Sequence, residues 1–299
     1  MNQPSRTPLF ALILPGLLVA ATGVGAGDLF AASLAGSKLK LAILWAAPAG
    51  VILKWTLNEG IARWQLATGT TLLEGWSQRL GRWMEWAFFA YLLIWSLVVG
   101  GALITACGVA GNSIFQSIVE VGDSNTSKIV WGIIHSLAGL ALVWWGGFKL
   151  FERLMAASVA VMFVCVLLTA ALLPGRDLSN TPLEGTVAPT WGEVFAGFIP
   201  GPIPEQGLGW FLGVLGGVGG TVTLLSYGYW IREAGRTGPQ AIRDCRIDLG
   251  VAYGLTAFFG VAMMIIGSIV PLDGQGPETA RALSSTLHSV LGPAGQWRS

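Results

Sequence analysis

Two short glycine-rich stretches interrupt hydrophobic segments, and the first of them carries a carboxylate. The chain reads GVGAGD from Gly23 to Asp28 and GGVGGT from Gly216 to Thr221. Glycine weakens a helix, so backbone carbonyl and amide groups there lose their helical partners and can hold a solute. A carboxylate deep in a membrane is costly and by default a functional candidate. The pattern predicts a binding site between two broken helices that includes Asp28, whose structural alternative is a cap on the half-helix that follows.

The segments that carry these stretches are long and apolar. The chain is 53% hydrophobic and 11% charged, with a mean hydropathy of +0.65, whereas a soluble domain carries about 25% charged residues. Apolar runs of about 20 residues recur, which is the length of a membrane-spanning helix, and they do not alternate as barrel strands do. We expect an all-α multi-pass membrane protein whose single transmembrane domain, 1–299, has spans near 10–36, 39–58, 84–110, 128–147, 150–173, 208–231 and 249–271.

The spacing of the two glycine stretches predicts an internal repeat. They lie five spans apart, and interrupted helices in corresponding positions of two halves are the best sequence pointer to a transporter site. A repeat of five spans predicts a first unit over 10–173 and an incomplete second unit over 208–299. We therefore expect a chain that is truncated after about seven spans. The connection 174–207, rich in proline and glycine, is expected to be an external loop with one short helix near 191–195.

The basic residues predict the orientation, because cytoplasmic loops carry more lysine and arginine. With the N-terminus inside, ten lysine and arginine residues lie in the inner segments and five lie in the outer segments. We expect a cell-membrane protein, a monomer in the lipid bilayer, with no nucleic-acid partner and no cofactor. The inner set is Arg6, Arg63, Arg79, Arg82, Lys149, Arg153, Arg232, Arg236, Arg243 and Arg246, and the outer set is Lys38, Lys40, Lys128, Arg176 and Arg281.

Several motifs, in order along the chain, resemble the Nramp family of metal transporters. PGLLVA at 15–20 is similar to the opening of the family's helix one, and IARWQLATG at 61–69, followed by Leu73 and Glu74, resembles the end of its helix two. GFKLFERLM at 147–155 is similar to the start of its helix five. The interrupted sixth span falls where the family's helix six is broken. The resemblance implies a LeuT-like inverted repeat with broken helices one and six.

The metal-binding residues of that family are not kept. Where the family has Asp-Pro-Gly-Asn, this chain has Gly25, Ala26, Gly27 and Asp28, and where the family has Met-Pro-His it has Thr223, Leu224 and Leu225. The family's helix-three carboxylates, thought to move protons, have no counterpart between 87 and 119. We therefore expect the family's scaffold without its metal ligands, and transport that is uncoupled from protons.

Loss of these side chains leaves room for a larger solute. A roomy site with ring faces and a few polar groups suits a small neutral polar molecule, and the first hypothesis is a transporter of a monosaccharide such as glucose. The alternatives are a transporter of hydrated Mg²⁺ or Mn²⁺ held by Asp28 and backbone oxygens, and a non-transporting remnant; an enzyme is the least favoured class. The candidate substrate-binding residues are Gly25, Ala26, Asp28, Trp95, Gly219, Gly220, Thr221, Thr223 and Tyr227.

Other polar and aromatic residues are given structural interpretations. Lys54 is expected to snorkel to the cytoplasmic face, and the single membrane histidine, His135, to serve packing or a hydrogen bond. Trp95 lies deeper than the other tryptophans, and such a residue is also typical of a helix core. The tryptophans expected in the interfacial belt are Trp45, Trp55, Trp83, Trp144 and Trp145.

Overall fold

Helices form all the regular structure of the residues that the computed structural model describes, which are 26–115, 123–178, 186–217 and 222–270 with Ala20, Thr286 and Val290. This confirms the all-α prediction. The elements are α2 (Ala26–Leu39), α3 (Ala46–Thr68), α4 (Leu72–Leu80), α5 (Trp83–Phe115), α6 (Ser124–Leu172), α7 (Trp191–Ala196), the short 3₁₀ helix η1 (Glu205–Gly207), α8 (Leu208–Gly217), α9 (Val222–Glu233), the 3₁₀ helix η2 (Pro239–Ala241) and α10 (Ile242–Ile269).

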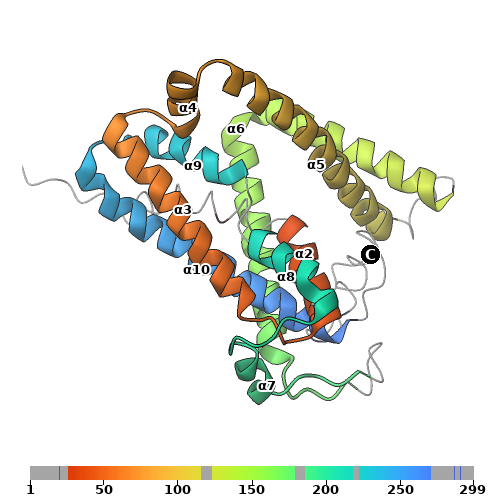
Figure 1. Ribbon diagram of the computed structural model, residues 1–299. Coiled ribbons are helices and arrows are strands. Elements are labelled where there is room, and N and C mark those ends of the chain that lie inside the picture. The colour runs from red at the N-terminus through yellow and green to blue at the C-terminus, as the bar shows by residue number, and fades with distance from the viewer. Residues whose placement is uncertain are drawn as a thin grey trace, which may run out of the picture.

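A central bundle holds the core. Helices α2 and α3 pack directly against α10, α8 packs against α2 and α3, α9 packs against α3, and the last part of α6 covers another side of α10 (Figure 1). Six of the eleven largest fully buried side chains, among them Tyr253, Phe259 and Met264, lie on α10. Phe163 of α6 stacks on Phe259 with ring centroids 6.1 Å apart. The seventh predicted span is thus the central helix of the bundle, and it begins at Ile242 rather than near 249.

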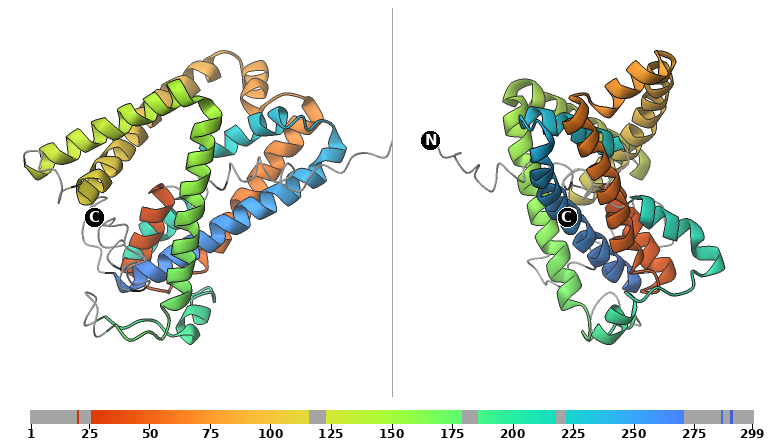
Figure 2. Two further views of the ribbon diagram at one scale, coloured as in Figure 1. Left: turned by 180° about the vertical axis from the view of Figure 1, so that it is seen from behind. Right: turned by 60° about the vertical axis from the view of Figure 1, so that its left-hand side comes forward.

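A helical hairpin projects from this bundle. Helix α5 and the first part of α6 lie side by side, as Figure 2 shows. Their backbones approach closely, since a Cβ on Gly108 would lie 2.1 Å from the Lys128 carbonyl oxygen. Small residues allow such approach between membrane helices. Apolar side chains of the hairpin, including Leu97, Trp144 and Trp145, are exposed, as expected for residues that face lipid.

The fourth and fifth predicted spans lie within one continuous helix, α6. It contains two apolar stretches of spanning length, Asn125–Gly146 and Arg153–Leu172, which match the predicted 128–147 and 150–173. The helix bends sharply between its two arms (Figure 2), and the Gly146–Gly147 pair lies in this interval. Glycine pairs are a recognised cause of such bends. Two spans are therefore joined by a bend and not by a loop.

Four stretches in the described part of the chain are long and apolar enough to cross a membrane: Trp83–Asn112, the two arms of α6, and Pro239–Ile269. The other predicted spans are not among these four, and most of the first span lies outside the described residues. Helices α2, α8 and α9 have 14, 10 and 12 residues, and a full crossing takes about 20. Helix α3 is long enough but carries Lys54, Asn58 and Glu59 among its buried residues.

The second span differs from its prediction. Residues 40–45 form turns, and α3 runs from Ala46 to Thr68 in place of the predicted 39–58. Gly69 ends it in the left-handed conformation, with φ 72°. Helix α4 follows, started by a capping box between Thr71 and Glu74. The short helix expected near 191–195 is confirmed as α7, which a second capping box starts at Thr190 and Glu193.

Candidate functional site

Span six consists of two helices, as the glycine stretch predicted. Helix α8 ends at Gly217 and α9 begins at Val222. The last four carbonyl groups of a helix and its first four amides have no partner within that helix. The break therefore presents acceptors from α8 and donors from α9, and the negative end of the α8 dipole points at it. Gly219, Gly220 and Thr221 lie outside the described residues, and of Thr223 the structure describes the backbone, within α9.

In span one, α2 begins at Ala26, inside the GVGAGD stretch. Gly25 lies outside the described residues, and of Ala26 and Asp28 only the helical backbone is described. Helix α2 crosses α10 at backbone contact. A Cβ on Gly36 would lie 2.2 Å from the Met264 carbonyl oxygen, and one on Gly267 would lie 2.2 Å from that of Ser33. These two glycines fix the position of the half-helix against the core.

Helix α3 lies along the break in span six. A Cβ on Gly50 would be 2.7 Å from the Leu215 carbonyl oxygen of α8, and a Cβ on Gly228 of α9 would be 2.5 Å from Gln65 Oε1. The end of α8 and the start of α9 fall between these two contacts. The part of α3 between Gly50 and Gln65 therefore faces the break.

Buried polar side chains occupy that part of α3. Lys54 is 6% exposed and Asn58 is fully buried. Asn58 Nδ2 donates to the Tyr253 hydroxyl of α10 at 2.9 Å, and Asn58 Oδ1 has no hydrogen-bond partner among the described residues. The prediction that Lys54 snorkels to the surface is wrong. The helix continues ten residues past Asn58 to Thr68, so Lys54 lies near its middle and is covered by the bundle.

Tyr227, a predicted site residue, belongs to an ionic cluster between α9 and α10. Its side chain is fully buried, and its hydroxyl donates to Asp248 Oδ2 at 2.9 Å. Arg236 Nη1 donates to the same oxygen at 2.9 Å, with 8% of the arginine side chain and none of the aspartate exposed. A buried ion pair needs such extra hydrogen bonds to offset desolvation. Tyr227 therefore faces α10 through this cluster.

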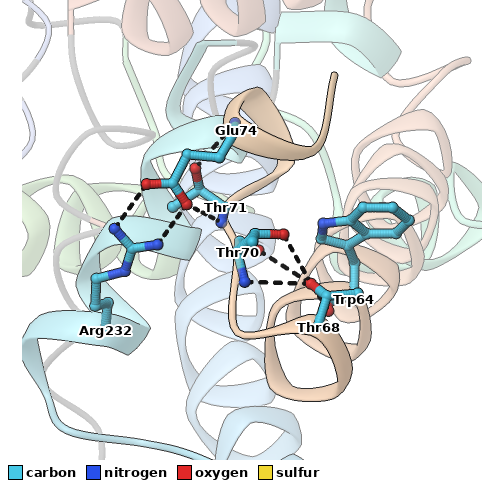
Figure 3. A network of polar contacts seen from close by, with 6 residues as sticks. All are labelled: Trp64, Thr68, Thr70, Thr71, Glu74 and Arg232. Atoms are coloured by element: carbon cyan, nitrogen blue, oxygen red, sulfur yellow. Dashed lines mark hydrogen bonds and ion pairs between the residues drawn. The ribbon is translucent and has the colours of Figure 1, made fainter. Parts of the chain in front are cut away.

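Two further carboxylates connect elements at the same end of the bundle. Glu59 Oε1 accepts from Arg246 Nε at 2.7 Å and Glu59 Oε2 from Arg63 Nε at 2.6 Å. Glu74 accepts from both terminal nitrogens of Arg232, at 2.9 and 2.5 Å, and also from the Thr71 backbone amide (Figure 3). The Arg232 hydrogen bonds, with that of Thr71, lower the pKa of Glu74 to about 2.

The remaining candidates lie on the projecting hairpin. Trp95 of α5 is 36% exposed, and α5 packs mainly against α6 and α4, so the described structure does not bring Trp95 together with Tyr227. His135 Nδ1 contacts the Trp131 carbonyl oxygen of its own helix at 2.8 Å, which agrees with a structural role. Within the described part of the chain, no three His, Cys, Asp or Glu side chains are grouped as metal ligands.

Half-helices packed against full-length apolar helices define a class, the multi-pass membrane proteins of the broken-helix, inverted-repeat type. A family model described as natural resistance-associated macrophage protein-like, Nramp, matches residues 16–298. The chain belongs to this family.

A solved structure shows the same fold. The crystal structure of a point mutant of the Eremococcus coleocola manganese transporter matches with a TM-score of 0.67 and 17% sequence identity, covering 99% of this chain and 64% of that chain. This chain thus spans a little under two thirds of that transporter's length. A comparison with curated protein sequences gives no match.

Proposed function

We propose that this chain forms the solute-binding part of a membrane transporter that works by alternating access in the cell membrane, with its N-terminus in the cytoplasm. The observation that carries the proposal is the division of span six into α8 and α9 beside the buried polar face of α3. Backbone breaks inside a membrane are tolerated only where protein buries them or where they line a cavity. A break flanked by Lys54 and Asn58 suits a polar solute.

The first candidate substrate is a small neutral polar molecule such as glucose. The replacement of the family's ligand motifs by glycine, alanine, threonine and leucine supports it. Lys54 gives independent support, because a fixed ammonium beside the break either repels a second cation or pairs with a carboxylate that a metal would need. The binding residues are proposed to be Gly25, Ala26, Asp28, Gly219, Gly220, Thr221 and Thr223.

A divalent cation, Mg²⁺ or Mn²⁺, is the second candidate. Membership of the Nramp family favours it, as does the likeness in fold to a protein named as a manganese transporter. In this case Asp28 and backbone oxygens at the two breaks would hold a hydrated ion, since both cations prefer oxygen ligands.

Uptake into liposomes that contain the purified protein distinguishes these candidates. We expect saturable entry of labelled glucose, no entry of Mn²⁺ or Mg²⁺, and loss of glucose entry in Asp28→Asn. Glu193→Gln is the matched control, because it changes a carboxylate in the connection 174–207 and keeps a side chain able to cap α7.

An imposed pH gradient tests coupling in the same vesicles. We expect the initial rate of glucose entry to be unchanged.

The comparison of solutes has two contrary outcomes. Entry of metal without glucose would replace the first candidate by the second. A wild-type protein that moves neither class of solute would contradict the proposed function.

A further inference from the structure

Lys54 is a buried cation on the part of α3 that lies between the approach of Gly50 to α8 and that of Gln65 to α9. It lies four residues, or about 6 Å, beyond Gly50 on the same side of α3. Side chains on a helix lean toward its N-terminus, so the Lys54 side chain leans toward Gly50. That glycine contacts the Leu215 carbonyl oxygen, at 2.7 Å from its ideal Cβ position.

Two oxygen acceptors lie on the neighbouring parts of α8 and α3, the Leu215 carbonyl oxygen and Asn58 Oδ1. Leu215 is among the last four residues of α8, whose carbonyl groups have no donor within the helix and form the negative end of its dipole. Asn58 Oδ1, one turn further along α3, is fully buried and has no hydrogen-bond partner in the described part of the chain. Half-helix ends and buried oxygens of this kind hold coupling cations in broken-helix transporters.

We propose that Lys54 fills a monovalent-cation site beside the break, so that its ammonium group takes the place of a freely bound cation. An ammonium group offers three hydrogen-bond donors and one positive charge, which suits several carbonyl oxygens at once. The charge then remains in the site throughout the transport cycle. This inference rests on the proposed function only for its effect on uptake, because the cation site itself can be tested without transport.

The chain shows the same chemistry at an accessible position. Lys40 Nζ donates to the Ser268 carbonyl oxygen at 2.9 Å, one residue before α10 ends at Ile269. Lys40 is exposed, so water can replace its ammonium group. It provides a matched control, a lysine that also binds a helix-end carbonyl but lies outside the core.

The experiment removes the ammonium group and returns it as a free ion. The purified Lys54→Ala protein, in detergent, is titrated with methylammonium and with Na⁺ while thermal unfolding is followed. We expect a saturable rise in Tm that the wild type and Lys40→Ala lack, since a ligand that binds only the folded state stabilises it. In liposomes, Lys54→Ala should lose solute uptake by about tenfold or more, because misplaced binding groups can lower rates by about 100-fold. Methylammonium should restore much of it.

Two further variants keep the test decisive if Lys54→Ala does not fold. Lys54→Arg keeps the charge and should retain uptake, whereas Lys54→Met keeps the length without the charge and should lose it. Uptake by Lys54→Met at the wild-type rate would overturn the inference. So would a titration in which methylammonium and Na⁺ raise the Tm of Lys54→Ala no more than they raise the Tm of the wild type. Absence of uptake in the wild type would contradict the proposed function alone, because the titration of Tm would still report on the cation site.

Discussion

The charged residues at one end of the bundle form pairs that join different elements. Asp248 of α10 accepts from Tyr227 of α9 and from Arg236 in the turn that follows α9. Glu59 of α3 accepts from Arg246 of α10. Removing one partner of a buried pair costs about 3–5 kcal/mol, whereas an exposed pair contributes about 1 kcal/mol or less. Removing one partner of the Asp248 cluster should therefore destabilise the fold more than removing one partner of the exposed Glu74–Arg232 pair.

Glu74 gives a pH dependence that can be separated from its role in capping. Its pKa falls from 4.5 to about 2 on folding, so its contribution to stability is complete above about pH 4.5 and is lost as the pH falls toward 2. Glu74→Gln keeps a side chain that can cap α4 and removes the ion pair with Arg232. We expect the wild type to have the higher Tm at pH 7.

The measurement is thermal unfolding of both proteins from pH 7 down to the lowest pH at which they stay folded. The difference in Tm should shrink steadily below pH 4.5, because the wild-type carboxyl becomes protonated. A difference that stays constant over this range would mean that the ion pair does not contribute. Since about 40% of each side chain is exposed, added salt should reduce the difference at pH 7.

At the scale of elements, glycine determines how closely the half-helices pack. Gly36→Ala would place a methyl group 2.2 Å from the Met264 carbonyl oxygen, so α2 must move away from α10. Overpacking of this kind costs about 1–3 kcal/mol, and we expect a lower Tm. Gly250→Ala on α10 is the control, because a Cβ there meets nothing within 4 Å. Equal Tm values for the two variants would contradict the close crossing of α2 and α10.

The elements could be predicted from the sequence where a local pattern decides them. Apolar run length locates α5, the arms of α6 and α10, and the glycines at 216–220 locate the break in span six. The position of Lys54 could not be found in this way. A lysine close to the end of a predicted span at Asn58 is interpreted locally as snorkelling, yet α3 continues to Thr68. Its burial depends on helices α8 to α10, which lie far away in the sequence.

The candidate site was predicted in part. The glycine stretch at 216–221 marks the division between α8 and α9, whereas the break predicted in span one lies outside the described residues. Asn58 and Tyr253 were missed, because a buried hydrogen bond between residues 195 positions apart leaves no local pattern. Helix α4 was missed as well, although the Thr71–Glu74 capping box is a pattern that could have indicated it.

The whole molecule has a proposed orientation that labelling can test. In a chain without Cys107, Cys165 and Cys245, single cysteines are introduced by Val187→Cys, in the 174–207 connection, and by Gln240→Cys, in η2. Both positions are exposed, Val187 at 89%. With the N-terminus inside, a membrane-impermeant maleimide should label the Val187→Cys protein in intact cells and the Gln240→Cys protein only after permeabilisation. The reverse pattern would invert the orientation.

The polar contacts of α9 also limit which helices can move independently of one another. Helix α9 is held to α4 by Arg232 and Glu74 and to α10 by Tyr227 and Asp248, whereas α8 is held to α2 and α3 by packing. Helix α9 also packs against α3, which in turn packs against α10, so we expect α3, α4, α9 and α10 to move together. One of the two fastenings is exposed and weakened by salt. We therefore expect higher ionic strength to loosen the link between α4 and α9 and to leave the buried contact between Tyr227 and Asp248 intact.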